Sequence, residues 1–306
     1  MKVGFTLRQL EYMVAVADHR SFRRAAEACM VTQPALSAQI AQLEETLGVQ
    51  LFERDRRKVL VTAAGTEIVA RARATLASAA AIAEVARTAA QPLSGTLRLG
   101  VIPTIAPYLL PVVLPAVRAA YPELRLILRE EQTARVLAQL DDGRLDAGVL
   151  ALPVPGDLAA IQLYREHFLL AAPLAHELAR RARVREDDLA GEDVLLLEDG
   201  HCLRDQALAV CSHAGSHEVA ELRATSLPTL VQMVASGQGV TLLPEMSAAV
   251  LAGRGTGVAS AKLAPAPGRD VGLVWRMSSA RGRELGLLAE VIRAEAARHL
   301  TALRKR

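Results

Sequence analysis

Apolar residues in the first third of the chain recur every three or four positions, which is the spacing of one face of a helix. Residues 6–20 form one such segment. Ser21 is suited to cap the start of a short second helix, and Thr32 the start of a third, with Pro34 in its first turn and Gly48 at its end. Two short helices joined by a tight turn, followed by a helix whose first residues are polar, predict a helix-turn-helix.

The polar start of the third helix is the part that a helix-turn-helix inserts into the major groove of DNA. Glutamine can pair with adenine there, and hydroxyl groups can contact bases or phosphates. The residues expected to contact DNA are Thr32, Gln33, Pro34, Ser37 and Gln39.

A cationic hairpin is predicted next, because residues 51–65 contain two short strand-like runs around a basic tip. Arg54, Arg57 and Lys58 belong to this tip. A charge run by itself is typical of a solvated turn. After a helix-turn-helix it indicates a wing that touches phosphates or the minor groove.

The segment SFRRAAEACMVTQPALSAQIAQLEETLGVQLFERDRRKVLVTAAG, residues 21–65, resembles the DNA-binding domain of LysR-type transcriptional regulators. The resemblance implies a winged helix-turn-helix over residues 1–65. It also implies double-stranded promoter DNA as a partner, with RNA polymerase as a further one. Cys29 is expected inside the second helix as a small buried core residue.

An Ala-rich stretch without Gly or Pro covers residues 66–90, and its apolar positions form a narrow seam. A helix of that length spans roughly 35–40 Å. Because so long a helix has little domain to bury it, pairing with a second copy is expected, and the resemblance implies that such linker helices dimerise. Pro92 and Gly95 mark the boundary, which gives a linker over residues 66–92. Homodimer and homotetramer both stay open.

From residue 93 to residue 306, strand-like and helix-like segments alternate, which predicts βαβ units with parallel pairing. The likeness to LysR-type regulators implies an α/β effector domain similar to periplasmic binding proteins. Its first subdomain is expected over about 93–165 and 269–306, and its second over about 166–268. Ligands of such folds bind in the cleft between the subdomains.

The motif EDGHCLRDQALAVC, residues 198–211, narrows the function. Cys202 follows His201 and lies two positions before Arg204, and both cationic neighbours and a helix N-terminus favour a thiolate. A thiolate attacks a peroxide oxygen to give a sulfenic acid, which can condense with a second cysteine such as Cys211. Two buried structural thiols are the plain alternative. The spacing lacks Cys-x-x-Cys, so no metal site is predicted.

This motif resembles the redox switch of the peroxide-sensing subfamily of LysR-type regulators. The likeness extends over nearly the whole chain and includes IPTIAPYLLP and RATSLPTLVQMVASGQGVTLLP. It implies that Cys202 is the peroxide-reactive cysteine and Cys211 the resolving one. The positions that match the surroundings of peroxide in the subfamily are Thr104, Thr133, His201 and Arg276.

Each of these four residues has a chemical use. The two threonine hydroxyls can donate to and accept from H₂O₂. Arg276 can hold negative charge beside Cys202, and His201 can orient the peroxide or relay a proton. The ordinary alternatives are helix N-caps for the threonines, a surface ion pair for the arginine and a polar loop position for the histidine.

Composition excludes several classes of protein. The 306 residues are 51% hydrophobic and 23% charged, so a substantial core is available. No apolar run approaches the roughly 18–20 residues of a membrane span, and no secretory leader follows Lys2, so a cytoplasmic address is expected. Three cysteines exclude a disulfide scaffold. The whole net charge of +3 falls in residues 1–92, which by itself is weak evidence for an anionic partner.

The sequence thus predicts a cytoplasmic, oligomeric regulator that needs no cofactor and is not an enzyme. H₂O₂ is expected to oxidise Cys202 and Cys211 to a disulfide, and this switch controls oxidative-stress genes. The nearest alternative is a LysR-type regulator that responds to a small organic effector in the cleft. A thiol peroxidase and a soluble binding protein that does not bind DNA are less favoured alternatives, because neither function needs a helix-turn-helix.

Overall fold

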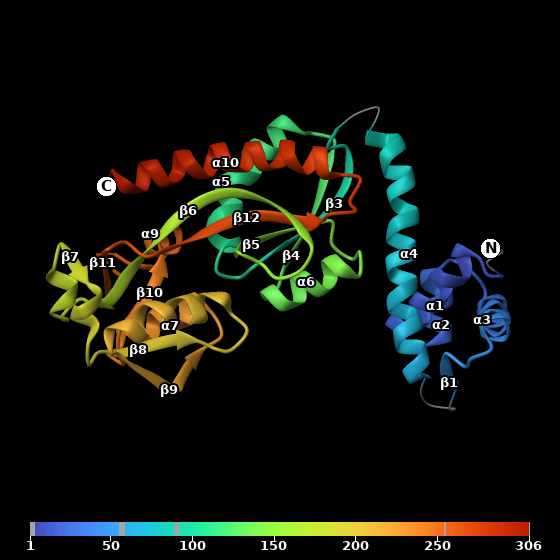
Figure 1. Cartoon of the computed structure of the whole chain (residues 1–306), viewed down its shortest axis with the longest axis horizontal. Helices are drawn as coiled ribbons and strands as arrows, with labels where there is room; N and C mark the ends of the chain where they lie inside the picture. Colours follow the sequence, from blue (N-terminus) through green and yellow to red (C-terminus); the bar gives the residue numbers. More distant parts are fainter. Residues whose placement is uncertain (1–3, 55–58, 89–91, 254, 306) are drawn as a thin grey trace. The chain divides into compact units, whose positions relative to one another are not determined.

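The structure, a computed structural model, describes residues 4–54, 59–88, 92–253 and 255–305. The chain divides into two units (Figure 1). One holds the residues up to Ala86 together with Asp141–Arg144, and the other holds Arg87–Leu140 and Leu145–Arg306. Within the described ranges, no helix is both long enough and apolar enough to cross a membrane.

Helices and one short hairpin make up the first unit. Its elements are α1 (Leu7–His19), α2 (Phe22–Ala28), α3 (Gln33–Leu47), β1 (Phe52–Arg54), β2 (Val59–Val61) and α4 (Ala63–Thr88). Their apolar faces meet in one core, in which Met13, Val16, Leu36, Ile40 and Leu43 are fully buried. The predicted helix-turn-helix with its hairpin is therefore confirmed.

Caps explain where these helices begin and end. The Thr6 hydroxyl accepts from the Gln9 amide, and the Gln9 side chain accepts from the Thr6 amide, so a capping box begins α1. Ser21 caps α2 in the same way with its hydroxyl. Gly48 ends α3 with a φ of 66°, a left-handed conformation that suits glycine. Cys29 differs from the expectation, because it follows α2 as its C-cap rather than lying inside the helix.

Helix α4 has 26 residues, so it is about 39 Å long at 1.5 Å per residue. Its first half packs into the core of its own unit, where Val69 is 7% exposed and Ala72 is 3% exposed. Further along, Ile82 is 75% exposed. The expectation that little of the domain buries this helix is therefore wrong for its first half.

An eight-stranded sheet forms the centre of the second unit. Its strands are β3 (Gly95–Val101), β4 (Leu124–Glu130), β5 (Ala147–Leu152), β6 (Leu158–Pro173), β7 (Arg183–Arg185), β10 (Thr241–Pro244), β11 (Val258–Ala264) and β12 (Gly268–Arg276). They follow the order β4-β3-β5-β12-β6-β11-β7, and β10 also pairs with β6. A two-stranded sheet holds β8 (Asp193–Leu197) and β9 (His217–Ala224).

Strand β6 joins the two halves of this unit, and β12 returns beside it (Figure 1). The predicted parallel pairing holds for β3 with β4 and with β5. It is wrong for β12, which is antiparallel to both β5 and β6. The reason is that β6 carries the chain from the first half into the second, while β11 and β12 carry it back in the opposite direction.

Helices cover the sheets of the second unit. They are α5 (Ala106–Ala120), α6 (Thr133–Asp141), α7 (Cys202–Ala214), α8 (Leu227–Ala235), α9 (Glu245–Leu251) and α10 (Gly282–Arg304). Pro111 and Pro115 lie inside α5, and both have exposed side chains. The pattern of apolar residues did not predict β7, α9 or β11, which are too short or too mixed in polarity to give a clear period.

Candidate functional site

A small pocket lies where three strands end. The residues that follow β3, β4 and β8 form its walls, and the carboxyl ends of strands are where α/β proteins usually bind ligands. Its empty volume is about 150 Å³. The lining residues are Ile102, Pro103, Thr104, Gln132, Thr133, Gly200, His201 and Cys202. The structure thus brings together four of the predicted site residues: Thr104, Thr133, His201 and Cys202.

Cys202 is the first residue of the 13-residue helix α7, and its thiol is free and partly buried. The first turn of a helix leaves backbone N–H groups unpaired and carries a partial positive charge. This charge stabilises a thiolate at the helix start. The position therefore suits a cysteine that acts as a nucleophile.

The turn before Cys202 requires a glycine. Gly200 has a φ of 93°, a backbone conformation that side chains with a Cβ rarely adopt. A Cβ at this position would also lie 2.9 Å from the Gln132 Oε1 atom. A side chain at residue 200 would therefore strain the turn that brings His201 and Cys202 against the loop after β4, mainly because of its positive φ.

Arg269 is the guanidinium that the structure places at this site, and the sequence reasoning missed it. Its Nη1 donates to the Thr104 hydroxyl at 2.8 Å, and its Nη2 donates to the Thr104 carbonyl at 3.0 Å. Its Nε donates to Glu166 Oε1 at 2.9 Å. Both members of this ion pair have side chains only 1% exposed. A lone arginine at the start of the apolar run after Gly268 was the signal that could have revealed it.

The neighbours of Arg269 determine its charged state. Burial, the largest effect, lowers the pKa of Arg269, but the negative charge of Glu166 and the hydrogen bond with it act in the opposite direction, and the pKa is raised. Arg269 therefore stays protonated in spite of complete burial. Cys202 is near enough to Arg269 to interact with its charge.

Arg276 is not part of this pocket, in contrast to the expectation. Its Nη1 donates to the carbonyl of Leu145 at 2.8 Å and also to the carbonyl of Leu140. Arg269 and Arg276 stand near opposite ends of β12, and seven residues of strand span about 23 Å. Arg276 therefore ties the end of α6 to β12, and Arg269 takes the place that the sequence assigned to Arg276.

The Thr133 hydroxyl is buried and has no hydrogen-bond partner within the described part of the chain. Thr133 begins α6 and lines the pocket together with Cys202. Burying a hydroxyl without a partner costs free energy, so such a group calls for an explanation. A small polar ligand in the pocket would supply the missing partner.

His201 is 6% exposed and lies next to Cys202 in the pocket wall. Burial lowers the pKa of His201 from its ordinary value of 6.5, and the negative charge of Glu198, whose Oε1 lies 3.9 Å from the ring Nε2, offsets only part of that. The imidazole is therefore mostly neutral at pH 7, and a neutral imidazole can accept a proton.

Cys211 lies on the same helix as Cys202 but in a different environment. It is 3% exposed, within the core of the unit. Burial raises its pKa from 9.0 to about 11, with the charge of Glu186 acting in the same direction and a hydrogen bond with Ser216 opposing. Nine helical steps separate the two cysteine Cα atoms by about 13–14 Å. Cys211 is therefore a protonated, sheltered thiol that is out of reach of Cys202 in this structure.

Arg204 does not act on Cys202 in the way that the sequence suggested. Its Nε donates to Asp199 Oδ1 at 2.9 Å and its Nη1 to Glu218 Oε1 at 2.8 Å. Arg223 donates to the same two carboxylates, which closes a ring of four charges. The carboxylates take up the charge of Arg204, so this ring fixes the start of α7 to β9.

The predicted DNA-contacting residues gather at the start of α3. Thr32, Gln33 and Pro34 are exposed, while Ser37 and Gln39 are half-buried. The opposite face of α3 is buried in the core. Arg57 and Lys58 lie outside the described residues, as does the side chain of Arg54.

Together, a winged helix-turn-helix and an α/β unit with a small polar pocket define the class of one-chain regulators that join a DNA-binding domain to a sensing domain. Comparison with known families agrees with this class. Residues 7–66 match the family of bacterial regulatory helix-turn-helix proteins of the lysR family, and residues 90–297 match the LysR substrate binding domain.

Characterised relatives are similar over nearly the full chain. The DNA-binding transcriptional dual regulator OxyR of Escherichia coli is 46% identical over 300 residues, which cover 98% of each chain. The hydrogen peroxide-inducible genes activator of Pectobacterium carotovorum subsp. carotovorum is 44% identical, covering 98% of this chain and 99% of that protein. The chain therefore belongs to the LysR family of bacterial regulators, in its OxyR branch.

Solved structures give the same result. A full-length OxyR variant from Pseudomonas aeruginosa superimposes with a TM-score of 0.79 at 36% identity, covering 94% of this chain and 95% of that one. An H₂O₂-bound OxyR variant from Corynebacterium glutamicum gives a TM-score of 0.68 at 37% identity, covering 97% and 94%. The predicted resemblance to LysR-type peroxide sensors is thus confirmed.

The Thr133 hydroxyl, which has no hydrogen-bond partner within the described residues, leads to a first prediction. Thr133→Val should leave the free energy of unfolding unchanged or raise it by up to about 1 kcal/mol, because it removes an unpaired buried hydroxyl. Oxidation of Cys202 by H₂O₂ should slow about five- to tenfold, while its alkylation by iodoacetamide should not. Stopped-flow kinetics measure both rates, with the exposed Thr301→Val as the matched control. Equal slowing with both reagents would contradict a peroxide-specific role.

The burial of Cys211 generates a second prediction. In a Cys29→Ser, Cys202→Ser protein, only Cys211 can be alkylated. At pH 8 its rate in the folded protein should be at least about a hundredfold below the rate in urea, because a pKa near 11 instead of 9 leaves that much less thiolate. The rate should rise about tenfold per pH unit up to about pH 10. Equal rates in buffer and in urea would show that the cysteine is not sheltered.

Proposed function

We propose that this protein is a hydrogen peroxide-sensing DNA-binding transcriptional regulator that a Cys202–Cys211 disulfide switches. The single observation that carries the proposal is Cys202 at the start of α7, in a pocket with an unpartnered Thr133 hydroxyl and the Arg269–Thr104 pair. The names of the relatives as hydrogen peroxide-inducible genes activators support it.

In the proposed first step, the Cys202 thiolate attacks one oxygen of H₂O₂. The S–O bond forms as the O–O bond breaks, the sulfur is oxidised to sulfenic acid, and the second oxygen leaves as hydroxide and takes up a proton to become water. The hydroxyl groups of Thr104 and Thr133 would hold the peroxide. His201 would orient the peroxide, accept the proton that the Cys202 thiol releases and pass it to the departing hydroxide, and Arg269 would balance the negative charge.

In the proposed second step, the Cys211 sulfur attacks the sulfur of the sulfenic acid. The S–S bond forms, the S–O bond breaks, and the oxygen leaves as a second water with the Cys211 proton. One H₂O₂ thus oxidises two thiols to a disulfide and gives two molecules of water. Because a disulfide needs Cα atoms less than about 7 Å apart, this step requires α7 to unwind.

Unwinding α7 would disrupt the surroundings of the helix as well as the helix itself. Leu203 and Ala207 would leave the core, where each is 2% exposed, and the ring around Arg204 would open. The reduced and oxidised forms would therefore be two distinct packed conformations, and the protein would change between them in one cooperative step. This is the physical basis for a switch that acts on the rest of the protein.

The proposed organisation is a winged helix-turn-helix over residues 1–65, a dimerising linker helix over 66–92 and a redox-sensing domain over 93–306. The working form would be a cytoplasmic homodimer or homotetramer bound to promoter DNA and acting on RNA polymerase. It would use no cofactor and would not be an enzyme, since it is oxidised once per switching event. A thiol peroxidase would instead turn over repeatedly with a reductant.

The alternative of a small organic effector at Cys202 has less support. Ligand pockets for such molecules usually have about 300–1,000 Å³, whereas this pocket is nearly closed and has no room for a molecule of that size. Its few polar groups suit a ligand as small as H₂O₂ better.

Mass spectrometry of the peroxide-treated protein tests the chemistry. The wild-type protein should gain a Cys202–Cys211 disulfide, Cys211→Ser should stop at an oxidised Cys202, and Cys202→Ser should form neither product. Cys29→Ser is the matched control and should behave as wild type. A peroxide-treated wild-type protein without the disulfide would overturn the proposed switch.

Hydrogen exchange tests the refolding separately. Residues 200–215 should lose amide protection after peroxide treatment of the wild-type protein but not of Cys202→Ser, because only the disulfide forces the helix to open. Unchanged protection in a protein with a confirmed disulfide would contradict the refolding while leaving the redox chemistry intact.

The DNA-binding surface gives a further prediction. Gln33→Ala should lose about 1–3 kcal/mol of discrimination at one base pair. Arg57→Ala should weaken binding to all sequences alike and reduce the salt slope by about 1. Binding to operator variants at several salt concentrations measures both effects. Gln42→Ala, exposed further along the same helix, is the matched control. A change in base preference from Arg57→Ala alone would contradict this docking.

A further inference from the structure

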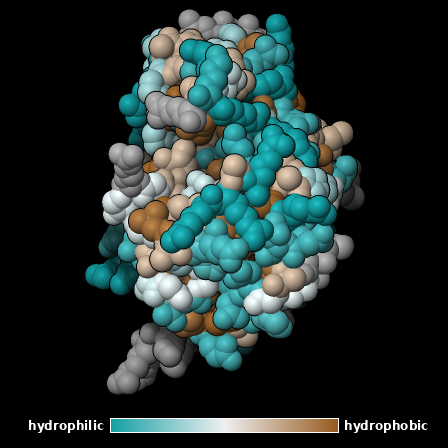
Figure 2. Space-filling model, turned by 90° about the vertical axis from the view of Figure 1, so that its left-hand side faces the viewer, coloured by the Kyte–Doolittle hydropathy of each residue, from teal (hydrophilic) through white to brown (hydrophobic). Residues whose placement is uncertain are grey.

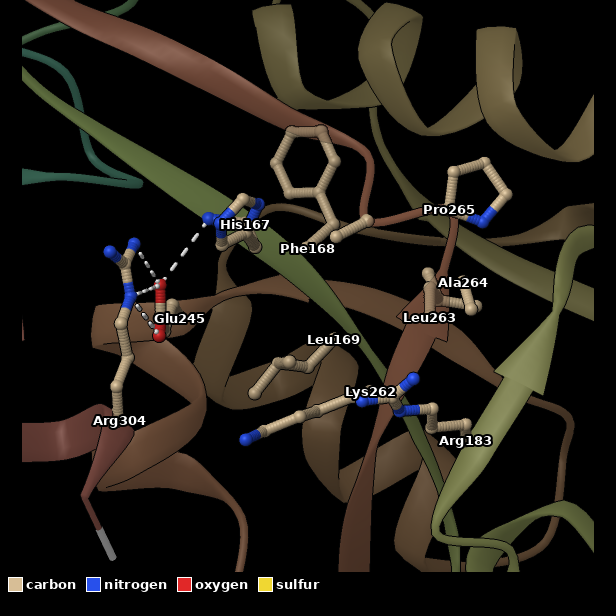
Figure 3. A pocket seen from close by; sticks show the side chains of 11 residues that line it. His167, Phe168, Leu169, Arg183, Glu245, Lys262, Leu263, Ala264, Pro265 and Arg304 are labelled. Atoms are coloured by element: carbon tan, nitrogen blue, oxygen red, sulfur yellow. Dashed lines mark hydrogen bonds and ion pairs between the residues drawn. The ribbon is translucent and has the colours of Figure 1, made fainter.

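A second and larger cavity lies in the same unit as the Cys202 pocket but shares no residue with it. Its volume is about 430 Å³, within the range of small-molecule sites. Strands β6, β7 and β11, the start of α9 and the last turn of α10 contribute its walls (Figure 3). The function proposed above makes no use of this cavity.

Two cations stand next to each other on one wall. Lys262 on β11 and Arg183 on β7 are register partners in a parallel pair, and both side chains are exposed. No ion pair holds either of them within the described part of the chain. Like charges on neighbouring strands destabilise a sheet. An anion bound at this wall would offset that repulsion.

The one carboxylate in the cavity is already neutralised. Glu245 accepts from Arg304 Nη2 at 2.9 Å and from its Nε at 2.9 Å, and Figure 3 shows this pair on the side of the cavity away from Arg183. The backbone amide of His167 also donates to Glu245, at 3.4 Å. Because these donors share its charge, Glu245 does not cancel the positive field of the opposite wall.

His167 supplies a polar atom that lacks a partner. Its ring Nδ1 is buried and has no hydrogen-bond partner within the described residues, although the ring belongs to the cavity wall. An atom of this kind is normally paired in a folded protein. A polar group of a bound ligand would be a suitable partner.

The rest of the wall is apolar and comes chiefly from Phe168, Leu169, Leu263 and Pro265. An inorganic anion would leave this surface unused, and a neutral molecule would leave the two cations unpaired. The outer surface favours a small molecule over a protein, because the end of the molecule shown in Figure 2 is mostly hydrophilic with only small, separate apolar patches.

We propose that this cavity is a binding site for a small organic acid. The carboxylate of the ligand lies against Lys262 and Arg183, and its apolar body lies against Leu169 and Ala264. The site is separate from the peroxide pocket, so binding does not require Cys202. The chain is thus a receptor for an organic anion in addition to its redox chemistry.

Isothermal titration calorimetry and ligand-observed NMR on the reduced full-length protein test the proposal, with hexanoate as the probe. Hexanoate should bind, while hexan-1-ol, which lacks the charge, and inorganic phosphate, which lacks the apolar body, should each bind about tenfold more weakly or not at all. Equal binding of hexanoate and hexan-1-ol, equal binding of hexanoate and phosphate, or no binding of hexanoate would overturn the proposal.

Variants locate the site. Lys262→Ala and Arg183→Ala should each weaken hexanoate binding about tenfold, because each removes one charged contact. Arg125→Ala, an exposed arginine on the strand β4, is the matched control and should bind as wild type does. Ala264→Phe, which fills the cavity, should abolish binding, with the melting temperature showing that the variant is folded. Unchanged affinity in the two cation variants would place the probe elsewhere and overturn the assignment.

Discussion

The buried ion pair between Glu166 and Arg269 is the interaction on which the sensing pocket depends. The two residues face each other on the neighbouring strands β6 and β12, and neither side chain is more than 1% exposed. Arg269 also donates hydrogen bonds to the hydroxyl and the carbonyl of Thr104. The second carboxylate oxygen of Glu166 accepts from the backbone amide of Met246 at 3.2 Å. One pair therefore joins two strands, the loop after β3 and the start of α9.

The energetics of this pair explain why its geometry is fixed. A buried charge that loses its partner typically costs 3–5 kcal/mol, so neither residue can move away without the other. Arg269 must then present its guanidinium at the same place beside the Cys202 pocket in every reduced molecule. The position of the positive charge at the site is thus set by the core of the protein rather than by a flexible surface chain.

Helix α7 imposes the second constraint. A helix keeps Cys202 and Cys211 about 13–14 Å apart, and it places one cysteine at a pocket and the other in the core. The same geometry that places Cys202 at the pocket therefore keeps the two thiols too far apart to bond in this structure. The ring of charges around Arg204 adds to the cost of leaving this state, because Asp199 and Glu218 are fastened to the first turn of the helix.

Much of this organisation could be predicted from the sequence, because caps and apolar periods are local signals. Ser21, Gly48 and the apolar faces of α1 and α3 predicted the helix-turn-helix, and the motif around Cys202 predicted the start of α7 as the candidate site. Long-range pairing was the part that failed. The short strand β7 and the long strand β6 pair with strands that are distant in the sequence. The local spacing of apolar residues does not predict such pairing.

Arg276 was assigned to the pocket from the resemblance to the peroxide-sensing subfamily, and the direction of β12 explains why Arg269 serves the site instead. Both arginines flank the apolar run of β12, so the pattern alone does not say which end faces Cys202. In the predicted parallel sheet, the carboxyl end of β12 would have lain beside the carboxyl ends of β3 and β5. Because β12 is antiparallel to β5, with Asp270 opposite Leu152, its amino end lies there instead. The direction of one strand therefore decides which arginine serves the site.

Adjacent residues of strand β6 belong to the ion pair that supports the Cys202 pocket and to the wall of the larger cavity. Successive side chains of a strand point to opposite faces, so Glu166 turns toward Arg269 while His167 turns into the larger cavity. The start of α9 contacts both, because Met246 donates to Glu166 and Glu245 accepts from the His167 amide. A displacement of β6 or α9 at the larger cavity would therefore act on Glu166, and through Arg269 on Thr104 in the wall of the Cys202 pocket.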